Sequence, residues 1–135
     1  MSTGHSDTTT EGIRIKVAAQ YIPLESDPAN NQFIYAYHVI IINEGRESVR
    51  LLSRHWQIRD SENELREVVG PGVVGQQPLI GPGETYSYES CCPLPTEWGT
   101  MEGTYTMQRE DGSTFEAKIG RFFLAPNVAP ISQLH

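Results

Sequence analysis

The sequence predicts an all-β fold, an antiparallel sandwich of about seven strands. Three observations favour it. Short apolar stretches alternate with a period of two, twelve glycines and nine prolines separate them, and no segment has the period of an amphipathic helix. Turn signals also recur at about the spacing typical of immunoglobulin- or fibronectin type III-like sandwiches. A small β-barrel is the alternative architecture.

The first half of the chain is predicted to hold three strands after a flexible tail. Residues 1–11 are polar and threonine-rich, without periodicity. Residues 13–21 alternate apolar and polar side chains, as in a strand with one wet face. Residues 33–42 are apolar on both sides, which indicates a central strand. Residues 49–58 form the third strand, with Trp56 as the leading candidate for the core aromatic.

Four further strands are predicted in the second half. They cover residues 65–69, 85–90, 104–109 and 114–124. A glycine- and proline-rich loop, residues 70–83, separates the first two, and Glu-Asp-Gly-Ser at residues 110–113 is a hairpin signal. Gly120 interrupts the alternation of the last strand, which indicates a bulge. The domain is therefore assigned to residues 12–126, and residues 127–135 are assigned to a C-terminal tail.

Charge and hydropathy exclude several classes of protein. The net charge of −7 argues against a nucleic-acid partner, because phosphate binding favours a basic excess. No apolar run approaches the ~20 residues that a membrane helix needs, so no membrane association is expected. The start of the chain lacks a basic segment followed by an apolar one, and a cytoplasmic location is therefore predicted.

The two cysteines, Cys91 and Cys92, are adjacent. Neighbouring strand residues point to opposite faces, so an ordinary disulfide between them would need a distorted backbone. Two adjacent thiols also lack the spacing of a structural zinc site. The sequence predicts one buried and one exposed thiol, with no base beside either.

Residues Gly70, Gly72 and Gly75 form a literal G-x-G-x-x-G pattern. No helix can begin after it, so the dinucleotide-binding interpretation fails. Two interpretations remain: a structural crossover between sheets that needs glycine for positive φ, and a loop whose amides converge on a phosphate. Arg54, Arg66 or Arg109 would add charge if the fold brings them close, whereas the net charge of −7 opposes an anion site.

No catalytic arrangement is visible. The four histidines, His5, His38, His55 and His135, have unrelated spacing, and no nucleophile elbow or metalloprotease motif occurs. The carboxylates are dispersed, so no acid–base pair can be argued. The sequence therefore predicts a protein that is not an enzyme and has no catalytic residues, no metal site and no cofactor.

Several separated motifs resemble the ApaG family, in the order in which the family has them. They are VVGPGVVGQQP at residues 68–78, Pro-Gly-Glu at 82–84, Tyr-Glu-Ser at 88–90 and GTMEGTYTM at 99–107, with LLSRHWQI at 51–58 and Phe-Phe-Leu at 122–124. The resemblance covers roughly residues 12–126. Family members often carry an acidic residue in place of Gln76 and a glycine in place of Cys91.

The resemblance implies a bacterial, fibronectin type III-like sandwich with no established enzymatic activity. Similar domains in eukaryotic F-box proteins look like interaction modules, so a non-catalytic protein–protein interaction role with an unidentified partner is expected. Two alternatives also come from the family. One is a nucleotide or pyrophosphate ligand at Gly70, Gly72 and Gly75, because the glycine motif of the family has been proposed as a pyrophosphate site; bacterial members are also linked by gene neighbourhood to a diadenosine tetraphosphate hydrolase. The other is a role in cobalt and magnesium handling. The sequence does not predict the oligomeric state.

Overall fold

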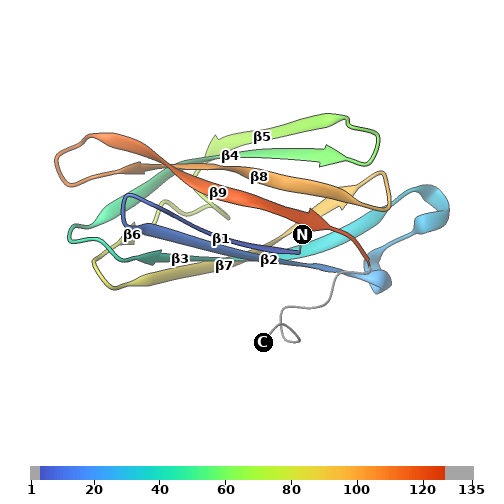
Figure 1. Cartoon of the computed structure of the whole chain (residues 1–135), viewed down its shortest axis with the longest axis horizontal. Coiled ribbons are helices and arrows are strands. Elements are labelled where there is room, and N and C mark those ends of the chain that lie inside the picture. The colour runs from blue at the N-terminus through green and yellow to red at the C-terminus, as the bar shows by residue number, and fades with distance from the viewer. Residues whose placement is uncertain (1–3, 127–135) are drawn as a thin grey trace.

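Two antiparallel β-sheets packed face to face make up the fold of the computed structural model, which describes residues 4–126 (Figure 1). The strands are β1 (His5–Thr10), β2 (Ile13–Tyr21), β3 (Phe33–Asn43), β4 (Val49–Asp60), β5 (Leu65–Pro71), β6 (Leu79–Ile80), β7 (Thr85–Leu94), β8 (Gly99–Gln108) and β9 (Thr114–Leu124). The first sheet has the order β1-β2-β3-β7. The second has the order β5-β4-β8-β9, with β6 also paired to β4. The predicted sandwich is confirmed.

The remaining regular structure is slight. Two short 3-10 helices, Pro23–Glu25 and Pro28–Asn30, lie between β2 and β3. Within residues 4–126, no helix is long and apolar enough to cross a membrane.

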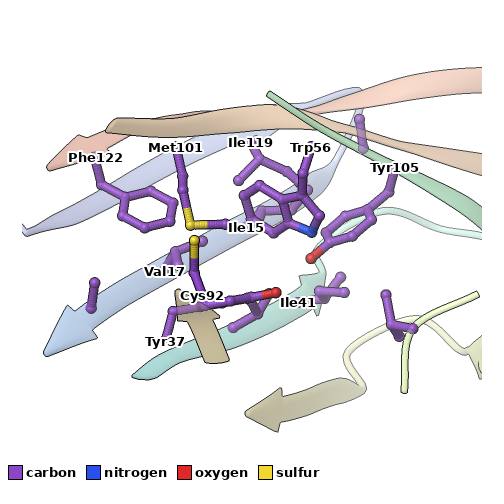
Figure 2. Packing of buried hydrophobic residues seen from close by; sticks show 14 of the residues in the cluster. Ile15, Val17, Tyr37, Ile41, Trp56, Cys92, Met101, Tyr105, Ile119 and Phe122 are labelled. Atoms are coloured by element: carbon purple, nitrogen blue, oxygen red, sulfur yellow. The ribbon is translucent and has the colours of Figure 1, made fainter. Parts of the chain in front are cut away.

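Trp56 lies at the centre of the core, as predicted, with 2% of its surface exposed. Its indole meets Tyr37, Tyr105 and Phe122 edge-on, at ring-centroid distances of 5.4, 6.2 and 6.1 Å. Figure 2 shows these rings between the two sheets, with the sulfur atoms of Met101 and Cys92 turned toward each other from opposite sides. Edge-to-face pairs of this kind stabilise a core beyond the burial of their area.

The predicted tail over residues 1–11 is wrong for His5–Thr10, which form β1. This strand pairs with β2 from His5↔Ala18 to Thr10↔Ile13. It also packs against β9, where the Lys118 amide donates a hydrogen bond to Thr10 Oγ1 at 3.1 Å. A polar strand is stable here because it fills the gap between two sheet edges. Residues 1–3 of the predicted tail and the predicted C-terminal tail at 127–135 lie outside the described residues.

Gly120 has the predicted bulge. On β8 only Glu102 separates Met101 from Gly103, whereas two residues of β9, Gly120 and Arg121, lie opposite it. A Cβ at Gly120 would come within 2.4 Å of Thr8 Oγ1. The missing side chain therefore lets β1 lie close to β9.

Residues 4–126 contain nine strands where about seven were predicted. Besides β1, the two-residue β6 was missed, because so short a strand has no periodicity. The strand predicted at 85–90 continues to Leu94 despite Pro93. A proline is tolerated there because β7 is an edge strand, on which one side of the backbone needs no ladder hydrogen bond.

The two sides of the sandwich differ. On one side β1 packs against β9, and this contact joins the two sheets. On the other side the sheets end in β5 and β7. That side carries the glycine motif at the end of β5, and it is the side with the candidate site.

Candidate functional site

The glycine motif ends in a tight two-residue turn. The Val73 amide donates to the Gln76 carbonyl at 2.8 Å, and the Gln76 amide donates to the Val73 carbonyl at 2.9 Å. Between them, Val74 and Gly75 both have positive φ, 48° and 77°. Two consecutive positive φ values are typical of a type I′ turn, whose twist matches that of the flanking strands.

Each glycine of the motif has its own structural reason. Gly70 pairs with Arg54 across β4 and β5, and a Cβ on it would lie 3.2 Å from the guanidinium. Gly72 combines a φ of +61° with a Cβ position only 2.2 Å from the Gln76 carbonyl oxygen. Gly75 has positive φ but open space around its Cβ position. Residues 70–83 carry the chain from β5 through β6 towards β7 in the other sheet, which agrees with the crossover interpretation.

The phosphate interpretation of this loop depends on amides that are free to donate. The Gly72 amide already donates to the Leu52 carbonyl at 2.8 Å, and the Val73 and Gln76 amides close the turn. Only the Val74 and Gly75 amides at the tip of the turn have no protein acceptor in the described residues. The loop therefore offers a ligand two amides, because the amides of Gly72, Val73 and Gln76 already donate to carbonyls of the protein.

Val74 is an unfavourable residue at its position, because β-branched side chains rarely adopt positive φ. We expect Val74→Asn to raise the free energy of unfolding by about 1 kcal/mol, since Asn-Gly is the preferred type I′ pair. Urea denaturation followed by circular dichroism measures this change. Val69→Asn, on the adjacent strand with negative φ, is the control and should not stabilise the protein. Equal effects of the two substitutions would contradict the assignment of strain to Val74.

Exposed apolar side chains gather along the outer strand of this side. Among the described residues, six large apolar side chains are exposed: Leu24, Leu65, Val69, Val74, Leu79 and Trp98. Four of them lie on β5, the turn and β6, with exposed fractions of 44% for Leu65, 71% for Val69, 63% for Val74 and 56% for Leu79. We call residues 65–80 the β5 edge. The register places Leu65 opposite Arg59 and Leu79 opposite Arg50, so the apolar side chains are spread along the length of this edge.

A cleft of about 280 Å³ lies between β5 and β7, on the inner side of the β5 edge. We call it the β5–β7 cleft. Its walls come from both sheets, and the lining residues include Tyr37, Arg54, Trp56, Arg66, Val68 and Ser90. Met101 and Cys92, facing each other in Figure 2, also line it.

Two of the three arginines named from the sequence lie on this cleft. Arg54 donates from Nη1 to the carbonyls of Pro71 and Gly72, at 3.0 and 2.9 Å. Arg66 donates from Nη2 to the Pro93 carbonyl at 2.9 Å. Neither has a carboxylate partner within residues 4–126. Arg109 instead pairs with Glu11 and lies 4.3 Å above the ring of Phe115, away from the cleft.

Burial holds the thiol and phenol groups next to the cleft in their neutral forms. Burial raises the pKa of the Cys92 thiol to about 11, while Cys91 is exposed, as predicted for the pair. Burial also raises the pKa of Tyr105, whose hydroxyl is hydrogen-bonded to that of Tyr88. The Trp56 Nε1–H has no acceptor among the described residues. A protonated thiol and neutral tyrosines supply no nucleophile or base at neutral pH.

The strand histidines lie apart from one another on different strands. His55 Nε2 is 2.7 Å from Glu67 Oε1, and His38 Nδ1 is 4.0 Å from Glu89 Oε1. No group of three or more potential metal ligands occurs in the part of the chain that the structure describes. His135 falls outside that part.

Known proteins are similar to this chain in sequence and fold. Residues 23–109 match the ApaG domain. A protein named ApaG from Methylobacterium sp. (strain 4-46) is 53% identical over 115 residues, which are 85% of this chain and 88% of that protein. The ApaG protein of Bordetella pertussis is 50% identical over 84% of this chain and 86% of its own length.

Solved structures agree with the architecture. The crystal structure of the ApaA protein from Bordetella pertussis has a TM-score of 0.83 and 44% identity, and covers 96% of this chain and 100% of that one. The C-terminal domain of wzt, at 9% identity and a TM-score of 0.55, shares the fold alone.

Proposed function

This chain belongs to the ApaG family, and from that premise we propose that it is a non-catalytic protein-interaction module whose docking surface is the β5 edge. The observation that carries the proposal is the exposure of Leu65 and Val69 on β5, a strand that ends its sheet, continued by Val74 in the turn and Leu79 on β6. The backbone of such a strand has hydrogen-bonding groups that can pair with another chain.

The other sheet ends are less suited to docking. β1 and β9 cover each other. On β7, Pro93 lacks an N–H, and its carbonyl already accepts a hydrogen bond from Arg66. Natural sheets commonly protect an edge with proline or with a covering element. Because β5 also ends in a proline, Pro71, the choice between β5 and β7 rests mainly on the exposed apolar side chains, which β5 has and β7 lacks among the described residues.

The occupant that fits is an extended segment of a partner protein, added as a further strand beside β5. Main-chain hydrogen bonds would supply affinity, and side chains on the outer face would supply specificity. On β5, Leu65 and Val69 have the same parity, so they lie on one face with Glu67 between them. The matching segment carries apolar residues on that face, placed at every other position.

A photo-crosslinking residue at position 69 tests the proposal, with position 16 as the matched control. Lys16 is also an exposed strand residue, but it lies on the other sheet. We expect position 69 to capture one protein that position 16 does not capture. A synthetic peptide copy of the captured region should then shift the amide resonances of residues 65–71 in an NMR titration.

The affinity of variants for that peptide distinguishes specific docking on β5 from non-specific binding. Val69→Lys removes apolar contact at the centre of the strand, so we expect about tenfold weaker binding. Lys16→Glu should leave the affinity unchanged. The proposal is wrong if position 69 captures only further copies of this chain, if both positions capture the same proteins, or if the peptide shifts no β5 amide.

A further inference from the structure

We propose that the β5–β7 cleft is a binding site for a small organic dianion, with one acidic group at Arg54, the other at Arg66, and an apolar middle over Trp56 and Val68. This inference concerns the inner side of β5 and does not depend on the partner proposed for its outer edge.

The charge of the cleft is opposite to that of the protein. The chain carries a net charge of −7, yet the described lining includes two arginines and no aspartate, glutamate or histidine. The carboxylate next to Arg66 in sequence, Glu67, is engaged with His55 on the other face of the sheet. Arginines without a carboxylate partner on a concave surface are a common means of recognising acidic groups.

The strand register separates the two arginines. Arg54 pairs with Gly70, and Arg66 pairs with Ile58, so the Trp56–Val68 pair lies between them. Four residues of strand correspond to about 13 Å between the backbone positions. The two side chains then contact different groups, Arg54 the loop carbonyls and Arg66 the Pro93 carbonyl on β7. The cationic groups therefore occupy two ends of the cleft, which suits two acidic groups better than one.

Both guanidiniums are held in place and still have donors to offer. Arg54 uses Nη1 for its two carbonyl partners, which leaves its Nε and Nη2 hydrogens without a protein acceptor in the described residues. Arg66 uses Nη2, which leaves its Nε and Nη1 hydrogens. Gly70 contributes by its lack of a side chain, because a Cβ there would crowd the Arg54 guanidinium. Cations positioned in advance lower the entropic cost of binding.

The size and lining of the cleft define the ligand further. A volume of about 280 Å³ is at the small end of the range for ligand sites. Between the arginines the lining is mainly apolar, with Trp56, Val68 and Met101, while Ser90 and Tyr37 bring hydroxyl-bearing side chains to the opposite wall. A dicarboxylate with a short methylene chain, such as glutarate, has the required chemistry.

Fluorescence titration in a Trp98→Phe background tests this inference. The chain has two tryptophans, so the signal then comes from Trp56 alone. We expect saturable binding of glutarate, and binding of butyrate, which has one carboxylate, that is weaker by about tenfold or more. Pyrophosphate, which has two acidic groups but no apolar middle, should also bind more weakly than glutarate.

Arg66→Gln should weaken glutarate binding about tenfold or more, because it removes one of the two charge-assisted contacts. Arg66 is exposed, so this variant should fold. Arg59→Gln is the matched control: it removes an arginine from the opposite face of β4, where Arg59 contacts Asn63, and should not change the affinity. The inference is overturned if glutarate does not bind at about 10 mM, if butyrate or pyrophosphate binds as tightly, or if both arginine variants have equal effects.

Discussion

Replacing Trp56 with alanine is expected to lower the free energy of unfolding by about 3–5 kcal/mol. Only 2% of the Trp56 surface is exposed, and its indole contacts the rings of Tyr37, Tyr105 and Phe122 from both sheets. Its removal leaves a cavity that these rings cannot fill without leaving their own positions. Since domains of this kind are stable by only about 5–15 kcal/mol, much of the total would be lost.

Urea denaturation followed by far-ultraviolet circular dichroism measures this loss without relying on tryptophan emission. Trp98→Ala is the matched control, because Trp98 is exposed and, within residues 4–126, its ring stacks on Phe123 alone. It should cost about 1 kcal/mol or less. Trp56→Phe should cost less than Trp56→Ala, since it keeps a ring and removes a buried N–H that has no acceptor in the described chain. Similar losses for Trp56→Ala and Trp98→Ala would contradict the central role of Trp56.

Periodicity predicts the strands that bury one face, and it fails for β1. In β2 the alternating burial of Ile13, Ile15 and Val17 is what the sequence pattern indicates. β1 is polar, and no pattern of its own sequence predicts a strand. Its position depends on pairing with β2 and on the space that Gly120 leaves beside it. The contact with Gly120 joins residues more than a hundred positions apart, which a local pattern cannot contain.

In the candidate site, too, some features are predicted by the local sequence and others depend on contacts made by the fold. The glycine motif is visible in the sequence, but the reason for each glycine is not, because Gly70 makes room for Arg54 whereas Gly72 avoids Gln76. Arg54 and Arg66 lie twelve positions apart and reach one cleft only through the register of β4 and β5. The β5 edge was not predicted either, since exposure of Val69 depends on which strand ends the sheet.

Alanine substitutions at Gly72 and Gly75 should have clearly unequal effects. Both residues have positive φ, which costs an alanine about 1–2 kcal/mol. At Gly75 nothing else opposes the new methyl group, so Gly75→Ala should cost no more than that. At Gly72 the methyl group would lie 2.2 Å from the Gln76 carbonyl oxygen, so the backbone must move. We therefore expect Gly72→Ala to cost about 3 kcal/mol or more.

The movement at Gly72 would also break contacts that organise both proposed surfaces. The Gly72 amide bonds to Leu52, and its carbonyl accepts from Arg54. Gly72→Ala should therefore weaken glutarate binding in the cleft as well as stability, while Gly75→Ala should leave glutarate binding near that of the unchanged protein. Urea denaturation and the Trp56 fluorescence titration give the two readouts. If the motif instead served only to let a ligand approach its amides, the two substitutions would impair binding alike and Gly72→Ala would not be the more destabilising.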